Sequence, residues 1–546
     1  MPTKGNHGVK FVYYANTKVW RVSVAGTFNG WNYLRGDMQN IGGKAWELEL
    51  SLPKGRHLYK IVINEEEWIV DPLNPNISED GQNNSAFTVT EDGEVLIRTT
   101  DISAQRPNYI YQNFTAVQSP EWIQKSVIYE LHLRAFGKHG FKGLMEKLEY
   151  LQELGVNTLW MMPFQQVGKQ KRQGTYGDPY AVQDYYSIDA SFGTAEDLRA
   201  LIGKAHGMGM RMIMDWVMNR GSVDHVWTGS HPEYFTRNGQ GEVYYEVPNR
   251  DYFAGLNFDN SEMRKSVIDA MTHWAADFDF DGFRLDDSDI TPVDFLEESR
   301  HALSRIKKDI VLISQSYDEY HHMVACDLTY DGSLRLLIQD MAENKVSQSD
   351  FARVYHSYKY SFPKGALRMR WLEEKEQTII REIFGEHLSK AAASVLLTMD
   401  GVPMIMMGQE FNERSLHTWT SLFEEYQLDW SHFDQELFEH YRFPIELRTR
   451  SAAFWNGELE FIAASEDKVL SYVRSSETEQ FLVIVSFSEN PLLARLDIEP
   501  EIRNPFLVHG ELIYRTGKGT HSISEDGDGI SLDPFETQIY RLEPHH

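Results

Sequence analysis

The sequence predicts a multidomain chain in which a (β/α)8 TIM barrel is flanked by an N-terminal β-sandwich and a C-terminal antiparallel β-sandwich. Residues 8–90 carry short strand patterns separated by glycine turns. Strand and helix patterns then alternate, and strand patterns return near the C-terminus. We therefore expect a β-sandwich over 1–90, a linker over 91–121, the barrel over 122–457 and the second sandwich over 458–546.

Both ends of the chain have the patterns of β-structure. Residues 46–52 alternate apolar and polar side chains, which is the period of a half-buried strand. The other runs are rich in β-branched and aromatic residues. The expected strands at the two ends are 9–14, 22–24, 46–52, 59–63, 481–485 and 538–542.

The middle of the chain repeats one unit, a short apolar strand followed by a helix. Alternation at this spacing implies parallel strands joined by crossover helices, and its repetition fits a closed (β/α)8 barrel. The methionine-rich run 404–407 is interpreted as a further buried strand. The other expected strands are 127–131, 156–160, 210–214, 282–285 and 310–314, and the expected helices are 144–154, 195–206, 262–277 and 292–308.

The composition is that of a soluble globular protein. The chain has 546 residues, of which 42% are hydrophobic and 25% charged, which excludes a disordered or collagen-like chain. Lys and Arg total 53 and Asp and Glu total 81, a formal net charge of −28. A surface this acidic repels phosphate, so we expect neither nucleic acid nor an anionic membrane as a partner. The single cysteine, Cys326, excludes an internal disulfide.

Polar residues follow the apolar strands of the predicted barrel. Three strands run directly into Asp215, Asp286 and Gln315. In such barrels the chemistry lies at the C-terminal ends of the strands, so these positions form the candidate site. Arg284 lies two residues before Asp286 on the same face of its strand, so its guanidinium is expected beside that carboxylate. This neighbouring charge favours an ionised Asp286.

From about 125 to about 450 the chain resembles the α-amylase family, glycoside hydrolase family 13. The resemblance includes the loop 180–185, Tyr-Ala-Val-Gln-Asp-Tyr, and the segment 401–410, from Gly-Val-Pro-Met to Gly-Gln-Glu. It implies a retaining α-glucosidase site, in which a nucleophile and a general acid/base lie about 5–5.5 Å apart. By this resemblance the nucleophile is Asp286, its arginine partner is Arg284, the buried structure-holding carboxylate is Asp215, and Tyr180 contacts substrate.

Four positions depart from the family pattern. The family's general acid/base, a glutamate after the fifth strand, falls on Gln315, whose amide has no proton to transfer. Losing positioned acid/base help typically costs roughly 10²–10⁴-fold in rate. The third carboxylate of the family falls on Glu376, which keeps the charge but adds a methylene. The sugar-contacting histidine falls on Lys375, and the histidine that ends the first motif falls on Arg220.

Two classes of function follow from this comparison. In the first, the protein binds α-glucans such as starch, glycogen or maltooligosaccharides, and hydrolysis is weak or lost. In the second, it is an active retaining hydrolase or transglycosylase. Its acid is then an unusual residue, such as Asp318 or Glu319, or the match of the family motif to Glu376 is wrong. The departures from the family pattern lie at several scattered positions. They therefore favour natural loss of hydrolysis over a single engineered change at Gln315.

The run 24–31, Val-Ala-Gly-Thr-Phe-Asn-Gly-Trp, resembles the family 48 carbohydrate-binding modules and the glycogen-binding domain of AMP-activated kinase β subunits. The resemblance implies that two tryptophans stack on sugar faces while polar groups bind the hydroxyls. It assigns these substrate-binding roles to Trp31, Trp68, Lys60 and Asn83. The alternative is that both tryptophans pack in the core or against the barrel.

No cofactor is predicted. The chain has no glycine fingerprint for a dinucleotide or a phosphate, and no Cys/His cluster with zinc spacing. Asn219 matches a position that binds calcium in some relatives, so calcium stays open as an alternative. No run of about 18 apolar residues is long enough to span a membrane, and no signal-peptide-like stretch follows Met1, so a cytoplasmic location is expected. The sequence leaves the oligomeric state open.

Overall fold

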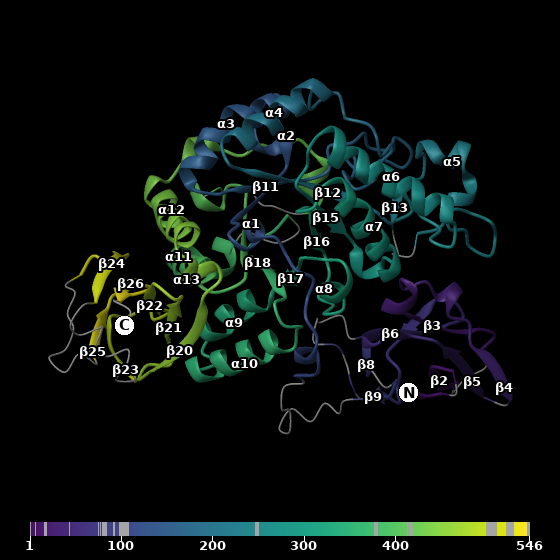
Figure 1. The fold of residues 1–546 in the computed structure, drawn as a ribbon, viewed down its shortest axis with the longest axis horizontal. Coiled ribbons are helices and arrows are strands. Elements are labelled where there is room, and N and C mark those ends of the chain that lie inside the picture. Colours follow the sequence, from purple (N-terminus) through teal and green to yellow (C-terminus); the bar gives the residue numbers. More distant parts are fainter. Residues whose placement is uncertain are drawn as a thin grey trace.

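The computed structural model places antiparallel sheets from the two ends of the chain at different sides of a central barrel (Figure 1). The N-terminal sheets are purple and the C-terminal sheet is yellow, with the barrel between them in blue to green. The structure describes residues 2–5, 7–15, 19–42, 44–74, 76, 78, 84–90, 93–97, 109–245, 250–375, 380–411, 413, 419–497, 510–519 and 529–542.

Eight parallel strands close the barrel, which confirms the predicted fold class. The strands pair in chain order, and the first strand, β10, pairs with both β11 and the last strand, β19. All five barrel strands expected from the alternation are present, and the methionine-rich run lies in β19. The strands are β10 Ile128–Leu131, β11 Thr158–Met161, β12 Arg211–Val217, β15 Gly282–Asp286, β16 Val311–Ser314, β17 Leu328–Asp331, β18 Leu367–Arg370 and β19 Val402–Met406.

Helices surround the strands and bury one face against them. None in the described part of the chain is long and apolar enough to cross a membrane. The main helices are α3 Phe141–Leu154, α4 Ala195–Gly207, α6 Ser261–Asp277, α7 Val293–Ile306, α9 Ser333–Ala342, α10 Gln348–Tyr360, α11 Ile380–Thr398 and α12 Gln435–Arg450. The shorter elements of this region are α1 Glu121–Gln124, α2 Leu133–Phe136, β13 Arg220–Ser222, α5 Val226–Ser230, β14 Phe253–Gly255, α8 His321–Val324 and α13 Ala452–Trp455.

The interior of the barrel contains both apolar and charged side chains. Ile128, Ile213 and Ile313 belong to one buried cluster inside the strands. Because successive side chains of a strand point to opposite faces, Glu130 shares the inner face with Ile128, and Asp215 shares it with Ile213. Charged groups therefore enter the barrel interior, where each must find a partner or lose its charge.

The N-terminal region is a sandwich of two antiparallel sheets. Phe11 and Trp46 from one sheet share a buried core with Val24, Tyr59 and Phe87 from the other. One sheet has the order β1 Thr3–Lys4, β2 Val9–Tyr14, β5 Ala45–Leu50, β4 Gln39–Gly42. The other has the order β3 Val22–Gly26, β6 Gly55–Ile63, β8 Ser85–Val89, β9 Val95–Leu96, with β7 Glu67–Ile69 also paired to β6.

The C-terminal region is a seven-stranded antiparallel sheet with strand order β24-β26-β22-β21-β20-β23-β25. Ala494 and Leu496 of β23 share a buried cluster with Val473 of β21 and Leu482 of β22, so the sheet folds over its own apolar face. The strands are β20 Glu458–Ala464, β21 Val469–Ser475, β22 Gln480–Ser486, β23 Leu492–Asp497, β24 Glu511–Arg515, β25 Gly529–Leu532 and β26 Thr537–Leu542.

Two glycines let the N-terminal sandwich approach the barrel closely. A Cβ on Gly30 would lie 2.9 Å from the carbonyl oxygen of Ile290, and one on Gly55 would lie 2.6 Å from the ring of Tyr320. Both glycines also have positive φ, 64° and 130°, which larger residues rarely adopt. The sandwich therefore packs on the loops that follow barrel strands β15 and β16.

Candidate active site

Asp286, the last residue of β15, is held by two guanidinium groups. Arg284 donates from Nη1 to Asp286 Oδ1 over 2.5 Å, as the shared strand face predicts. Arg220 donates from Nη2 to Asp286 Oδ2 over 2.5 Å. The side chain of Asp286 is only 4% exposed. Both oxygens of the predicted nucleophile are therefore engaged in buried ion pairs.

Asp215, on the neighbouring strand β12, anchors this cluster. Its Oδ1 accepts from Arg284 Nη1 at 2.9 Å. Its Oδ2 accepts from the hydroxyl of Tyr180 at 2.8 Å and from Trp160 Nε1 at 3.1 Å. Asp215 is completely buried. This geometry matches a carboxylate that holds other groups in place, and it brings together three of the predicted site residues.

Arg220 bridges two consecutive carboxylates. Besides Asp286, its guanidinium donates from Nη1 to Asp287 Oδ2 at 2.7 Å. It also lies over the ring of Phe253, 4.5 Å from the centroid. The planar fork of an arginine suits such bridging, whereas the histidine of the family pattern presents only two ring nitrogens. The substitution at this position therefore adds a buried positive charge directly on the predicted nucleophile.

Gln315 follows β16, where the general acid/base of the family would lie. Its Oε1 accepts a hydrogen bond of 2.9 Å from the backbone N–H of Asp287. Asp287 has φ 45°, in the left-handed region that non-glycine residues rarely adopt. The amide oxygen of Gln315 thus supports the strained turn that follows Asp286. A carboxamide can accept this bond but carries no transferable proton.

Burial and charge act in opposite directions on the two aspartates. Burial acts to raise the pKa of Asp286, but the charges of Arg220 and Arg284 outweigh it, so its pKa lies below the ordinary value. Burial raises the pKa of Asp215, and the Arg284 charge only partly offsets this. Asp286 is therefore ionised at neutral pH, but its charge is already paired with the two arginines within the protein.

Lys375 joins the same cluster from the segment after β18. It is fully buried, and its Nζ lies 5.3 Å from the centroid of the Tyr180 ring and 5.8 Å from that of Trp160. The charge of Lys375 also lowers the pKa of Asp286, but less than the charges of the two arginines do, and burial acts in the opposite direction. Glu376, the predicted third carboxylate, lies outside the described residues.

Glu130 is a buried carboxyl group that the motifs did not identify. It lies on the inner face of β10, fully buried, and neither carboxylate oxygen has a hydrogen-bond partner in the described part of the chain. Burial raises its pKa to about 8, although the charge of Lys375 acts against this. Glu130 is therefore mostly protonated at neutral pH, which avoids an uncompensated charge inside the barrel.

The variant Glu130→Gln is expected to change the pH dependence of stability. The folded state holds the Glu130 proton more tightly than the unfolded state, so the wild type loses stability as pH rises from about 4.5 to about 8. Glutamine cannot ionise, so the variant gains relative to the wild type by up to about 1.4 kcal/mol per pH unit. Urea unfolding between pH 5 and pH 8 measures the difference. Glu149→Gln, at a side chain that is 81% exposed, is the control and should follow the wild type. Parallel curves for Glu130→Gln and the wild type would contradict the assignment.

The two alternative acids lie on the loop after β16. Glu319 Oε1 accepts from Arg56 of the N-terminal sandwich at 3.0 Å, so this carboxylate is directed to the domain contact. Asp318 Oδ1 accepts from the backbone N–H of Tyr320 at 2.8 Å. Burial raises the pKa of Asp318 to about 6, partly offset by that hydrogen bond. Burial raises the pKa of Glu319 as well, so the two carboxyl groups differ in their contacts: Glu319 is held by Arg56, which makes Asp318 the better candidate for a general acid.

The predicted sugar-binding residues of the N-terminal sandwich lie near its contact with the barrel. Trp31 and Trp68 are half-buried and pack on one small cluster, together with Tyr244 of the barrel region. The ring of Tyr33 lies 6.3 Å from Trp68 and 6.3 Å from Tyr244, edge-on to both. Lys60, on β6, is also half-buried. Asn83 lies outside the described residues. Inter-domain packing, the alternative reading of these tryptophans, accounts for part of their burial.

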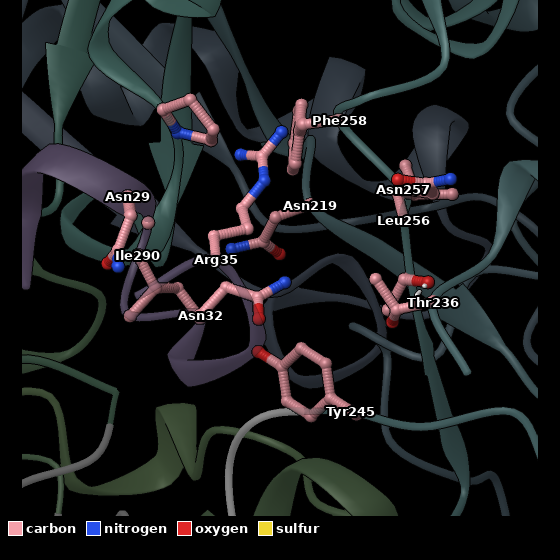
Figure 2. Close-up of a pocket in the computed structure, with 13 residues that line it drawn as sticks. Asn29, Asn32, Arg35, Asn219, Thr236, Tyr245, Leu256, Asn257, Phe258 and Ile290 are labelled. Atoms are coloured by element: carbon pink, nitrogen blue, oxygen red, sulfur yellow. Dashed lines mark hydrogen bonds between the residues drawn. The ribbon is translucent and has the colours of Figure 1, made fainter. Parts of the chain in front are cut away.

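Asn219 borders a small pocket between the sandwich and the barrel. Figure 2 shows Asn32 and Arg35 of the sandwich facing Asn219 and Tyr245 of the barrel. The amide oxygen of Asn219 accepts from Arg220 Nη1 at 2.9 Å, so a positive charge already lies where calcium would need an oxygen ligand. No group of three or more His, Cys, Asp or Glu side chains suited to a metal occurs among the described residues. These residues do not fit a calcium ion.

Four side chains complete the cluster although the sequence reasoning did not name them as site residues. Trp160 stands out in the sequence only by its indole group, and Glu130 only by its carboxyl group, each within an apolar strand. Asp287 directly follows the predicted nucleophile, a signal that was available. Tyr245, whose hydroxyl donates to Asp287 Oδ2 at 2.9 Å, lies in a loop and had no such signal.

The eight-stranded parallel barrel, with its cluster of carboxylates and guanidinium groups at the carboxyl ends of the strands, places this protein in the class of the (β/α)8 barrels and puts its candidate site where such barrels carry their chemistry. Comparisons with known proteins show which members of this class the chain is similar to. Residues 136–254 match the family "Alpha amylase, catalytic domain". The crystal structure of a noncanonic maltogenic α-amylase, AmyB of Thermotoga neapolitana, is 28% identical and covers 78% of this chain and 100% of its own, with a TM-score of 0.70.

Curated relatives agree with this result. The α-amylase MalA of Haloarcula japonica is 24% identical over 478 residues, which cover 83% of this chain and 67% of that protein. A trehalose synthase of Thermus thermophilus is 34% identical over 232 residues, 35% of this chain and 23% of that protein. Residues 136–254 of this chain are therefore similar to the α-amylase catalytic domain, and the barrel has the fold of a maltogenic α-amylase.

Proposed function

We propose that this protein binds α-glucans and has lost the hydrolytic activity of the α-amylase family. The observation that carries the proposal is the pair of changes at Gln315 and Arg220. An amide takes the position of the proton donor, and a second guanidinium occupies the free oxygen of Asp286. The first change removes proton transfer, and the second reduces the nucleophilicity of the carboxylate.

Retaining hydrolysis requires both functions in turn. A carboxylate attacks the anomeric carbon while an acid protonates the leaving oxygen, and the same residue then takes a proton from water. Asp286 can attack only after its Oδ2 leaves Arg220. Gln315 can perform neither proton transfer. The missing acid/base alone lowers the rate of hydrolysis by roughly 10²–10⁴-fold.

The relatives named above support the choice of ligand. Their names describe an α-amylase, a maltogenic α-amylase and a trehalose synthase. The resemblance of the N-terminal sandwich to glycogen-binding modules points to the same ligand class. Trp31 and Trp68 are each part-exposed and supply the aromatic faces that such binding uses.

The active-hydrolase alternative rests on Asp318. This carboxyl group is buried, its pKa is raised to about 6, and it lies three residues after Gln315. An enzyme that used Asp318 as its acid would lose nearly all activity in the variant Asp318→Asn, while Gln315→Ala would retain it.

Incubation with maltoheptaose tests the proposal. We expect the protein to bind maltoheptaose at equilibrium and to leave it intact when products are followed by chromatography. A parallel incubation uses an aryl α-maltoside, whose leaving group needs little protonation, so any residual attack by Asp286 appears there first. Turnover of maltoheptaose at ordinary enzyme rates, above about 1 s⁻¹, would overturn the proposal.

A further inference from the structure

Two aromatic rings lie beside the ion pairs of the candidate site, and cations of the protein already lie over both. The ring of Tyr180 has Lys375 Nζ at 5.3 Å and the guanidinium carbon of Arg284 at 6.0 Å from its centroid. The ring of Trp160 has the same two cations at 5.8 and 5.0 Å. A cation within about 6 Å of a ring centroid is attracted to the face of the ring. The protein itself therefore occupies the faces on which a sugar would stack.

The same cluster offers almost no surface to a ligand. Tyr180, Trp160 and Lys375 are completely buried, and Asp286 is 3% exposed. Stacking on a sugar needs an exposed ring face, because the C–H groups of the sugar replace water there. Among the described residues that line the pocket beside Trp371, none is Tyr180, Asp286 or Lys375. A sugar therefore cannot reach the predicted nucleophile in this arrangement.

Lys375 differs from the other groups that cover this site. Arg284 belongs to the barrel wall, where it donates to Asp215 and Asp286 from strand β15. Lys375 comes instead from the segment after β18, and it reaches the two rings with a long, flexible stem. Removing Arg284 would break the ion pairs of the barrel interior, whereas a shorter residue at 375 would uncover the rings. Lys375 is therefore the side chain that closes the site.

The charge of Lys375 also determines which ligands could displace it. Burial acts to raise the pKa of Asp215 and Asp286, and Lys375 acts alongside Arg284 to lower it. A neutral sugar that displaced the ammonium would leave these buried carboxylates with one positive charge fewer, which is strongly unfavourable. A ligand of sugar size that carries its own ammonium group would replace the lost charge.

We propose that Lys375 closes the barrel site, because its ammonium lies among the rings of Tyr180 and Trp160 and the carboxylate of Asp286, where a sugar would have to bind. This closure rests on the contacts of the cluster alone. The corollary that an α-glucan is held elsewhere on the chain rests on the proposed function. Closure adds a third obstacle to hydrolysis, beside the changes at Gln315 and Arg220.

Calorimetric titration of the full-length chain with isofagomine tests the closure. This probe is a glucose-shaped ring whose nitrogen is protonated at neutral pH, so it can supply the ammonium that Lys375 provides. Lys375→Ala uncovers the rings and is expected to bind the probe at least tenfold more tightly than the wild type. Lys375→Met fills similar volume without the charge, and this matched control should stay within twofold of the wild type.

Three further measurements complete the design. Circular dichroism shows whether each variant is folded, and Lys375→His, which also shortens the side chain, replaces the alanine variant if that variant does not fold. Adding Asp286→Asn to Lys375→Ala should abolish the gain, because the probe then loses its carboxylate partner. Maltoheptaose is titrated into the wild type in parallel.

The outcomes separate the closure from the proposed function. Wild-type protein that binds isofagomine as tightly as Lys375→Ala would overturn the closure, because the site would be open with the lysine in place. A folded Lys375→Ala or Lys375→His variant that gains no affinity would overturn it too, as would a gain that persists with Asp286→Asn. Failure of the wild type to bind maltoheptaose would overturn the proposed function and leave the closure standing.

Discussion

Replacing Arg284 by methionine is expected to lower the free energy of unfolding by about 3–5 kcal/mol, the largest stability effect in the barrel interior. The guanidinium is fully buried and donates to Asp215, Asp286 and Tyr330. Methionine fills similar volume but leaves two carboxylates with one charge partner fewer in a dry environment. Urea unfolding followed by circular dichroism measures the loss.

Arg353→Met is the matched control for this experiment. Arg353 pairs with Asp350 on α10, but the two side chains are 72% and 44% exposed. Exposed pairs contribute at most about 1 kcal/mol, so this variant should unfold close to the wild type. A similar small loss for Arg284→Met would mean that Asp215 and Asp286 take up protons or water readily, and that the cluster is not a tight ion network.

The second large effect concerns activity. Gln315→Glu alone is expected to raise maltoheptaose hydrolysis less than tenfold, because Arg220 still occupies Asp286 Oδ2. The combined variant Gln315→Glu, Arg220→His, Lys375→His and Glu376→Asp restores the family pattern at all four departures. We expect it to hydrolyse at least about 10²-fold faster than the wild type, the lower end of what acid/base help contributes.

Product formation from maltoheptaose, measured at equal protein concentration, compares these variants. Arg353→Ala serves as a substitution that should not change the rate. Full recovery by Gln315→Glu alone would contradict the role given to Arg220 and would point to a single change in an otherwise competent enzyme. No gain in the combined variant would mean that the loss of hydrolysis has a further cause outside these four positions.

Much of the architecture could be predicted from local patterns. The period of two in 46–52 and the strand–helix alternation each depend on neighbouring residues, so the sandwich and the barrel could be read directly. Asp215, Asp286 and the position of Gln315 followed because parallel strands bring their carboxyl ends together. The Arg284–Asp286 pair followed from their spacing of two on one strand.

Contacts between distant segments could not be read in this way. The bridge from Arg220 to Asp286 and Asp287 joins the short strand β13 to the end of β15, 66 residues later, and no periodicity encodes it. The burial of Glu130 depends on which face of β10 points inward. The docking of the sandwich through Gly30 and Gly55 depends on shape complementarity between two domains.

A single long incubation of the wild-type protein with a stoichiometric amount of maltoheptaose, followed by chromatography of the sugar, tests directly whether the barrel has lost hydrolysis. With no proton donor at position 315 and with Asp286 tied to two arginines, the heptasaccharide should bind and be recovered whole. Rapid conversion to shorter sugars, abolished by Asp286→Asn, would show instead that this barrel cleaves glycosidic bonds with an acid from another position.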